Sequence, residues 1–600
     1  MTVSHPSSPR PTSLRIADRF DDGADVAWRE FGDGPLHSLP TMLRRDDGTV
    51  RDALLDVLHA ASEVRVGGRS VAEHLTIGDR PSHWWMGLVH AKRWGEVGVL
   101  ADLAKLLVLG DLVASLAPDE VTVSLADPHV AAAAAATVRR ASPGARVTVA
   151  GPAPARPRAI GQHVRAAAHL ARRLTWRHSV PRASDDGAGP RIAMADYLFR
   201  LPASVLEGGA YSSRYWGPLP SAIDETGASV TWLHRFTPHD GIPRLRDARR
   251  LVRGLNAAGE RHHLLDGATP ATAVRAVVRY VRLLRTSRRV HAATGAFVTE
   301  RADLRPILGR EWDGSFRGSH ALSCALLTER IAEVVASLPP HARGIYIMEN
   351  QPWEYALQHA WRGTGHGPLV GVAHSTVRHW DLRYHGARRA PIGSPAGPPA
   401  PDLVAVNGPT GRAALEASGM DPARIVEVEA LMYLYLAPLV RSDDPHGVLV
   451  LGELDTVHTQ RLVDAVATVL PRTGGSVPVT FKPHPLTPSS AFVIPDRRIA
   501  PSTADIGGLL AGARCTVVGA SGSAVLESAC LGIPVVALLN ADDLELLPVS
   551  SHPLLATVES PAALADAVLA ALSQPMGGSA AADGTFHLDA ALPRWRRVLA

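Results

Sequence analysis

The sequence predicts an α/β fold built from two doubly wound units of parallel strands joined by a hinge. Three observations lead to this prediction. Short apolar runs rich in valine, typical of strands buried on both faces, recur along most of the chain. Helical patterns follow most of these runs, which is the order of parallel crossover connections. A polar break with Asp-Asp-Pro near residue 444 separates an earlier series of runs from a later one.

Length and composition narrow the class of protein. The chain has 600 residues, of which 46% are hydrophobic and 20% charged, so it can bury a sizeable core and is not globally disordered. Three scattered cysteines exclude a disulfide framework and a cysteine-rich metal site. The net charge of +4 is small for this length and argues against nucleic acid as a partner.

The N-terminal region carries few strand signals. We expect residues 1–30 to form a disordered tail, because they are polar and contain neither an apolar run nor a secretory signal. Charges interrupt the apolar segment 97–117, so we expect a buried amphipathic helix there and not a membrane span. A strand, a helix and a strand at 121–125, 129–140 and 146–150 indicate a parallel crossover.

Two later segments are strongly basic. Residues 159–178 and 271–289 have helical patterns with repeated arginines, and no acid occurs between residues 151 and 184. One interpretation is a solvated helix or linker. The other is a patch for anionic lipid or a lipid-phosphate acceptor. We therefore expect a cytoplasmic protein and leave open a peripheral contact with the inner face of the membrane.

The remaining strands divide the chain into two domains. We expect residues 31–440 to form an N-terminal α/β domain with helical and basic insertions, and residues 441–600 to form a C-terminal one. The hinge would lie at 436–447 and close a cleft on movement. Strand-like runs are expected at 191–195, 229–233, 344–348, 369–373, 403–406, 425–428, 448–451, 477–481, 515–518 and 535–538.

The segment Thr-Phe-Lys-Pro-His-Pro at 480–485 follows a predicted strand. Ligands bind at the carboxyl ends of strands in open α/β sheets. Lys482 and His484 can both donate hydrogen bonds to phosphate, and two prolines restrict the loop between them. Lys482 stands out because only three of the 62 basic residues are lysines; Lys92 and Lys105 fall in helical stretches without a motif, and we expect them to be ordinary. The other interpretation is a proline-rich surface turn.

A glycine-serine turn at 519–523 follows another predicted strand and leads into a helix. Backbone N–H groups there, with the hydroxyls of Ser521 and Ser523, are typical of an anion site. Glu527, one turn into the helix, can accept hydrogen bonds from ribose hydroxyls. A Gly-x-Ser-x-Gly nucleophile elbow is disfavoured because its last glycine is absent. A purely structural cap on a buried helix is the other alternative.

These two loops together resemble the donor-binding half of GT-B glycosyltransferases. The closest likeness is to capsule-type and sialyltransferase-like enzymes, in which a Lys-Pro-His-Pro or His-Pro motif precedes a serine motif. The resemblance implies two Rossmann-like domains facing a cleft, with a helical N-terminal extension. It also implies a nucleotide-sugar donor, often a CMP-sugar such as Kdo or a nonulosonic acid. Lys482 and His484 would stabilise the departing phosphate, with Ser521, Gly522 and Ser523 beside them.

A second pair of strand ends carries Glu349, in Glu-Asn-Gln-Pro-Trp-Glu, and His374, in Gly-Val-Ala-His-Ser-Thr. Parallel neighbours would place both at one sheet edge, where Glu349 could act as general base and His374 as a ligand of phosphate or carboxylate. A pair of satisfied polar residues is the alternative. These segments resemble bacterial surface-carbohydrate (O-antigen type) biosynthesis proteins, as do the runs at 215–219 and 83–85.

Other residues are expected on the acceptor side. Trp84, Trp85, Tyr215 and Trp216 could stack on a sugar, although a core role is equally open. Asp196, at a strand end, is a second choice of base. Arg378 follows His374 by four residues and is another acceptor-side candidate.

The sequence therefore favours a glycosyltransferase that moves a sugar from a nucleotide-activated donor to a glycan or lipid-linked glycan of a surface polysaccharide. No Asp-x-Asp motif lies at a strand end, so no metal site and no cofactor are expected. No Gly-x-x-x-x-Gly-Lys loop is present, which argues against an ATPase. A nucleotide-sugar epimerase or hydrolase of the same fold, and a non-catalytic carbohydrate-binding assembly protein, remain as alternatives.

Overall fold

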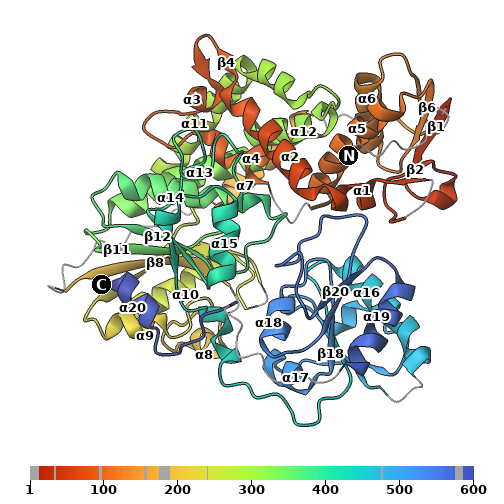
Figure 1. Cartoon of the computed structure of the whole chain (residues 1–600). Helices are drawn as coiled ribbons and strands as arrows, with labels where there is room; N and C mark the ends of the chain where they lie inside the picture. Colours follow the sequence, from red (N-terminus) through yellow and green to blue (C-terminus); the bar gives the residue numbers. More distant parts are fainter. Residues whose placement is uncertain are drawn as a thin grey trace.

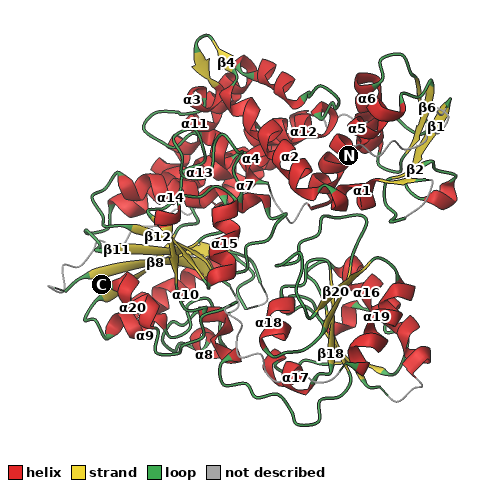
Figure 2. Ribbon diagram, in the orientation of Figure 1, coloured by secondary structure: helices red, strands yellow, loops and turns green. Residues whose placement is uncertain are grey.

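Three parallel sheets organise the chain (Figures 1 and 2). The computed structural model describes residues 12–32, 36–92, 97–154, 159–173, 189–199, 201–239, 241–473, 477–574 and 585–600. In Figure 1 the C-terminal sheet lies at the lower right, the largest sheet at the left, and the N-terminal sheet at the upper right. Helices occupy the top of the molecule, between the largest sheet and the N-terminal sheet.

The largest sheet has the strand order β10-β9-β8-β11-β12-β13-β14, and all its pairings are parallel. The order reverses between β8 and β11, which defines a doubly wound sheet with a switch point. The strands are β8 (Arg191–Leu198), β9 (Ser229–Phe236), β10 (His262–Leu264), β11 (Arg343–Ile347), β12 (Leu369–Ala373), β13 (Leu403–Val406) and β14 (Ile425–Glu427).

The C-terminal sheet repeats this arrangement with the order β17-β16-β15-β18-β19-β20, again all parallel. The predicted pair of Rossmann-like units is therefore confirmed. The strands are β15 (Val448–Leu451), β16 (Val479–Lys482), β17 (Ile499–Pro501), β18 (Cys515–Gly519), β19 (Val535–Leu538) and β20 (Leu555–Val558). Their helices are α16 (Thr456–Val469), α17 (Ile506–Gly512), α18 (Ala524–Cys530) and α19 (Pro561–Ser573).

The N-terminal sheet was not expected as a third unit. Its order is β3-β2-β1-β6-β7, and β1 lies at its centre, so the predicted disordered tail is wrong for residues 12–30. The buried residues of β1 are Leu14, Ile16 and Ala17, too short an apolar pattern to stand out among polar neighbours. The strands are β1 (Ser13–Ala17), β2 (Val26–Ala27), β3 (His37–Ser38), β6 (Glu120–Ser124) and β7 (Arg146–Val149), and α6 (Pro128–Ala141) completes the predicted crossover.

Helices fill the space between the N-terminal and largest sheets. Helix α5 (Val97–Leu116) is buried on nearly every side and is therefore not amphipathic as expected. Its Asp102 accepts a hydrogen bond from the indole of Trp28 at 2.7 Å. No helix of the described residues is long and apolar enough to cross a membrane. The other helices here are α1 (Leu39–Arg45), α2 (Asp47–Glu63), α3 (Val71–His74), α4 (Leu88–Ala91), α7 (Ala159–Arg173), α11 (Pro270–Arg289), α12 (Arg305–Phe316) and α13 (Gly318–Ala336). Between α2 and α3, β4 (Arg65–Val66) and β5 (Arg69–Ser70) form an antiparallel pair.

The end of the chain returns to the largest sheet. Phe586 still packs with the core of the C-terminal domain, but α20 does not belong to that domain as expected. The carboxylate of Glu429 accepts hydrogen bonds from the N–H groups of Arg594 and Trp595, both at 3.0 Å. Trp595 is fully buried in the core beneath that sheet. The helices of this domain are α8 (Ala203–Leu206), α9 (Leu219–Asp224), α10 (Leu245–Ala257), α14 (Pro352–Arg362), α15 (Pro409–Ala417) and α20 (Pro593–Leu599).

The N-terminal unit also contacts the C-terminal domain. Lys105 of α5 is fully buried, and its ammonium donates to the carbonyl of Ala541 at 2.7 Å. Burial lowers the pKa of Lys105 to about 8 despite the opposing effect of Asp102. Lys92 is buried too and donates to the carbonyl of His385 at 2.7 Å. Both lysines therefore hold segments together, contrary to the expectation that they are ordinary.

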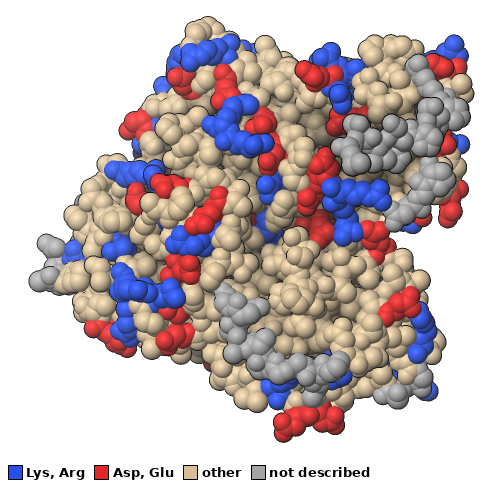
Figure 3. All heavy atoms as spheres, in the orientation of Figure 1, with Lys and Arg blue, Asp and Glu red and all other residues tan. Residues whose placement is uncertain are grey.

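Charged side chains are mixed over the face drawn in Figure 3, where Lys and Arg alternate with Asp and Glu and no field of one sign dominates. Ion pairs also bridge the N-terminal unit and the C-terminal domain. Arg29 lies 3.4 Å from Asp542, and Arg44 lies 3.3 Å from Glu545. The contact between the two units is therefore partly ionic.

Candidate functional site

The carboxyl edges of the largest and C-terminal sheets face each other. A small pocket between them is lined by residues that follow β12 and β13, by Leu526 of α18, and by Phe586. Arg378, after β12, interacts electrostatically with Glu453, which follows β15. Arg214, from the loop before α9, interacts with Glu527 of α18. The loops that follow β12 and β15 therefore approach each other between the two domains, as do the loop before α9 and helix α18.

Glu349 and His374 lie at this edge on the side of the largest sheet. They follow the parallel neighbours β11 and β12, and His374 Nε2 lies 3.9 Å from Glu349 Oε1. The expected adjacency is confirmed. Arg383 lies 3.9 Å from the other oxygen of Glu349, so that carboxylate stands between an imidazole and a guanidinium.

The motif around Glu349 has a structural explanation in Glu354. The buried carboxylate of Glu354 accepts hydrogen bonds from the N–H groups of Glu349, Asn350 and Gln351 at 2.9–3.1 Å. It thereby forms the capping box that begins α14. Burial raises the pKa of Glu354 well above its ordinary value, and the nearby charge of Glu349 adds to the effect. Glu354 shapes the loop that presents Glu349.

His374 is nine-tenths buried, and its Nδ1 has no hydrogen-bond partner among the described residues. Burial lowers its pKa; Glu349 opposes this shift and Arg383 adds to it. The imidazole is therefore neutral at pH 7. The ring of Tyr215 lies edge-on to it, with centroids 5.2 Å apart. A neutral buried imidazole with a free nitrogen can accept a proton from a bound hydroxyl.

Arginines supply positive charge beside this pair. Arg383 donates two hydrogen bonds to Asp381, at 2.8 and 2.7 Å, in a buried bidentate pair. Burial would raise the pKa of Asp381, but Arg383 outweighs it and the pKa is lowered. Arg378 is buried as well, and burial lowers its pKa. Asp381 is the main charged neighbour of Arg378 as well, and Arg378 also interacts with Glu453 of the C-terminal domain.

Lys482 is the last residue of β16 and His484 follows that strand, at the carboxyl edge of the C-terminal sheet. The ammonium of Lys482 donates to the carbonyl of Ala504 at 2.6 Å. His484 Nδ1 accepts from the N–H of Leu486 at 3.3 Å. The loop packs closely on Gly452, where an added Cβ would lie 3.1 Å from the backbone nitrogen of His484. Lys482 and His484 are therefore held next to the end of β15.

The N–H and hydroxyl groups of Ser521 already donate hydrogen bonds within the protein. Both groups donate to Glu453 Oε1, at 2.5 and 2.6 Å. The Gly522 N–H donates to Gly519 and closes the turn, and Ser523 begins α18 without a side-chain cap. The expected anion-binding groups thus hold a carboxylate of the chain itself. Sequence reasoning missed Glu453, although its position two residues after a valine-rich strand is the same signal that identified Glu349.

Glu527 is buried, and the hydroxyl of Tyr435 donates to its carboxylate. Burial raises the pKa of Glu527, while Tyr435 and Arg214 oppose this. Arg214 and Tyr435 were also missed, because neither stands in a motif. Tyr435 belongs to the segment that joins the two domains, so Glu527 is linked to that connection.

Three acceptor-side candidates lie in the core and do not reach the cleft. Asp196 and Trp216 are fully buried and Trp84 is 2% exposed. Asp196 accepts hydrogen bonds from Tyr211, Trp216 and His234 at 2.7–3.1 Å, so its carboxylate is satisfied internally. A saturated buried carboxylate cannot meet a substrate hydroxyl. Trp85 is buried against His90, and only Tyr215 of the aromatic candidates lies beside the site.

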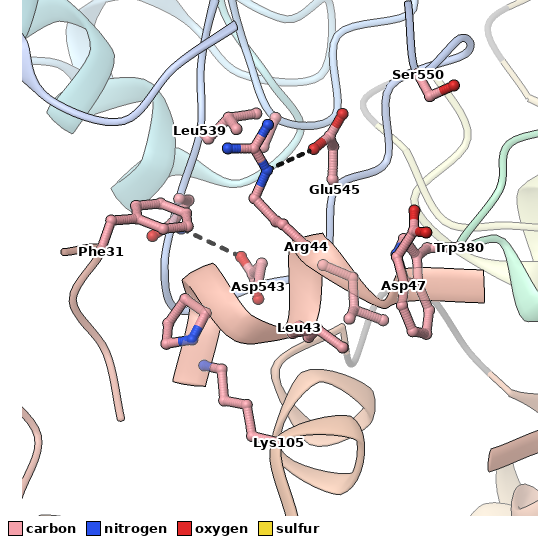
Figure 4. A pocket seen from close by; sticks show the side chains of 14 residues that line it. Phe31, Leu43, Arg44, Asp47, Lys105, Trp380, Leu539, Asp543, Glu545 and Ser550 are labelled. Atoms are coloured by element: carbon pink, nitrogen blue, oxygen red, sulfur yellow. Dashed lines mark hydrogen bonds and ion pairs between the residues drawn. The ribbon is translucent and has the colours of Figure 1, made fainter. Parts of the chain in front are cut away.

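Two further cavities lie at the carboxyl edge of the C-terminal sheet, next to the N-terminal unit. One of about 150 Å³ lies between α1 and the loop after β19 (Figure 4), where Arg44 reaches Glu545 and Lys105 points in from below. The other, of about 600 Å³, extends past Phe31 and Arg29 to Glu453 and Gly519. Because Glu453 lines it, this larger cavity adjoins the loop that holds Ser521.

Among the described residues, no group of three or more His, Cys, Asp or Glu side chains is arranged to hold a metal ion.

No protein-family model matches the chain, and no curated protein is similar to it in sequence. Solved structures with a similar fold include the following three. The glycotransferase of kitacinnamycin is 12% identical, covers 66% of this chain and 92% of its own, and has a TM-score of 0.35. MurG of Acinetobacter baumannii is 10% identical, with coverages of 64% and 90% and a TM-score of 0.32. Spinosyn rhamnosyltransferase SpnG with thymidine diphosphate is 13% identical, with coverages of 68% and 98% and a TM-score of 0.33. Likeness at this level carries no argument about activity.

Proposed function

We propose that this chain is a glycosyltransferase that transfers a sugar from a nucleotide-activated donor to a hydroxyl acceptor. One observation carries the proposal: two doubly wound sheets present their carboxyl edges to a common site. One edge holds Glu349 and His374. The other holds Lys482 and His484, together with Ser521 and Glu527. A proton acceptor thus faces groups suited to phosphate, as transfer from a nucleotide-sugar requires.

The acceptor hydroxyl would bind beside His374. His374 is neutral at pH 7 because burial lowers its pKa, so it can take the proton as the acceptor oxygen attacks the sugar carbon. The Glu349 carboxylate, 3.9 Å away, would then stabilise the imidazolium. The geometry thus favours His374 as base and Glu349 as its partner, the reverse of the roles expected from the sequence. Asp196 is no longer proposed, because it is saturated in the core.

The bond that breaks joins the sugar to the donor phosphate, and its electron pair leaves with the nucleotide. Lys482 and His484 would stabilise that negative charge, with Ser521 beside them, and Arg378 could add to them from the opposite domain. For Ser521 to bind phosphate, Glu453 must first release its N–H and hydroxyl. Binding of the donor is therefore coupled to movement of the Glu453 side chain.

We propose the identities of the donor and the acceptor from the resemblance of the sequence motifs alone. This resemblance favours a CMP-sugar, such as Kdo or a nonulosonic acid, as donor and a glycan or lipid-linked glycan of a surface polysaccharide as acceptor. We propose that transfer needs neither metal nor cofactor, because the basic side chains of the cleft can compensate the phosphate charge. Unchanged transfer in the presence of a chelator is the expected result.

The test is an assay of purified protein with CMP-, UDP-, GDP- and dTDP-sugars, each with and without glycan acceptors. We expect one donor to be consumed only when acceptor is present, and His374→Ala to abolish transfer without unfolding the protein. Stoichiometric free sugar or epimer without acceptor would instead identify a hydrolase or epimerase. Failure of every nucleotide and nucleotide-sugar to bind would identify a non-catalytic protein.

A further inference from the structure

Helix α11 exposes an apolar stripe. Val274, Val277, Val278 and Val281 are 65%, 37%, 46% and 38% exposed. Their spacing of i, i+3, i+4 and i+7 places them on one face, the pattern by which a surface helix normally packs on a core. The opposite face of α11 already packs inward through Ala273, Ala276 and Tyr280. The valine stripe is therefore a second apolar face that no described residue covers.

Four arginines extend the same face of α11 toward its C-terminal end. Arg282, Arg285, Arg288 and Arg289 follow the valines, and none forms an ion pair with a described residue. The other two arginines of α11 differ: Arg275 lies 3.5 Å from Glu329, and Arg279 is buried and donates to the carbonyls of Ile77 and Pro81. The helix contains no acidic residue. Apolar and basic groups thus lie next to each other on one exposed surface.

Helix α7 packs on α13, as α11 does, and it also has an exposed outer side. Its Ala166 and Leu170 pack in the same apolar cluster as α11, on α13. On its outer side Val164 is 63% exposed, and Arg165 is exposed beside it. The two basic segments found in the sequence, more than a hundred residues apart, therefore flank one helix. The remaining residues of the first basic segment, 174–178, lie outside the described part of the chain.

The combination of exposed valines and exposed arginines indicates which kind of partner this surface would bind. Nucleic acid would engage the arginines but gains nothing from a row of exposed valines. Aliphatic side chains enter the boundary of the acyl chains, and arginines bind the phosphates above it, so an anionic bilayer uses both features. We propose that the outer face of α7 and α11 docks the protein on anionic phospholipid. This proposal does not depend on the proposed activity, since docking is measured without substrate.

The test is co-sedimentation with vesicles of phosphatidylglycerol and phosphatidylcholine in equal parts, compared with phosphatidylcholine alone. The wild-type chain should bind the anionic vesicles, and added salt should weaken this binding. Val278→Asp/Val281→Asp and Arg285→Glu/Arg289→Glu should each reduce it at least about tenfold, since every basic residue near an anionic surface contributes to affinity. Unchanged thermal unfolding would show that the variants fold.

The matched controls lie elsewhere on the molecule. Val457→Asp/Val493→Asp changes two exposed valines of the C-terminal domain, and Arg253→Glu changes an exposed arginine of α10; both should bind as wild type. Absence of binding to anionic vesicles, equal binding to neutral ones, or wild-type binding by the α11 variants would each overturn the proposal. A dimer dissociated by Val278→Asp/Val281→Asp, with no vesicle binding, would assign the face to a second copy instead.

Discussion

The carboxylate of Glu453 accepts two hydrogen bonds from Ser521, one from its N–H at 2.5 Å and one from its hydroxyl at 2.6 Å. Glu453 follows β15 and Ser521 follows β18, the two strands between which the order of the C-terminal sheet reverses. Ligands of open α/β sheets bind at this point. The Glu453 carboxylate thus occupies the N–H and hydroxyl groups of Ser521 that we assign to the phosphate of the nucleotide-sugar.

Glu453→Gln should tighten nucleotide binding about tenfold, because a neutral amide competes less strongly than a carboxylate for the Ser521 donors. Calorimetric titration with the cognate nucleotide measures this. Glu207→Gln, at an exposed position of the largest domain, should bind as wild type. Weaker binding by Glu453→Gln would mean that this carboxylate itself holds the ligand.

Gly519→Ala should destabilise the protein by about 1–3 kcal/mol. The added Cβ would lie 2.3 Å from the Glu453 carboxyl group, so that side chain must move. Gly508→Ala, where a Cβ meets no atom within 4 Å, is the control and should have little effect. Urea unfolding gives both values. The cost of Gly519→Ala should shrink in a Glu453→Ala background, and strict additivity would contradict the contact.

His374→Ala and Glu349→Gln should each lower kcat by about 10²–10⁴-fold while nucleotide affinity stays the same. The pH profile separates their roles. If His374 is the base, activity falls as pH decreases through its pKa, which burial places below 6.5. Because Glu349 raises that pKa, Glu349→Gln should move the acid limb to lower pH. If the acid limb of the pH profile stays in place in this variant, a group other than His374 titrates there.

Asp196→Asn should destabilise the fold by about 3–5 kcal/mol, because it breaks the buried pair with His234. Chemical unfolding measures the loss. Nucleotide affinity, and kcat of the fraction that remains folded, should not change, since Asp196 does not reach the cleft. A variant that folds normally but no longer transfers sugar would restore Asp196 as a base.

Stability should fall as pH decreases below 6.5. Burial lowers the pKa of eleven described histidines, including His263, His341 and His385, each to about 4. The unfolded chain therefore binds more protons than the folded one between about pH 6.5 and 4, and folding is disfavoured there. Four carboxyls with raised pKa act in the opposite direction but are fewer.

Unfolding free energies at about pH 7.5 and about pH 5 check this prediction. His263→Asn should reduce the slope with pH by about 1.4 kcal/mol per unit, the value of one proton. A stability that is constant over this range would contradict neutral buried histidines.

The sequence predicted the two larger sheets because their strands are continuous apolar runs, which are visible without tertiary context. It failed for β1, whose burial depends on pairing with β6, more than a hundred residues away. It also assigned α20 to the wrong domain, since nothing local shows that Glu429 caps this helix.

For the candidate site, strand-end position placed Glu349 and His374 at one sheet edge, where the structure brings them 3.9 Å apart. A shared role of this pair with Lys482 and Ser521 in ligand binding stays a prediction. The same criterion included Asp196, because sequence does not show that Tyr211, Trp216 and His234 saturate it. It omitted Arg383 and Tyr435, whose places depend on how loops fold over the sheet edges. Composition marked Lys482 as unusual, but Lys92 and Lys105 are the buried lysines, and all three donate to backbone carbonyls.

The central claim is that the cleft binds a nucleotide through the C-terminal edge and reacts through the edge of the largest sheet. Calorimetric titration of wild type, His484→Ala and His374→Ala with CMP, CDP, UDP, GDP and dTDP tests it most directly. We predict that the wild type binds one nucleotide, that His484→Ala weakens binding at least about tenfold, and that His374→Ala binds as wild type. No binding by the wild type, or unchanged binding by His484→Ala, would contradict the account.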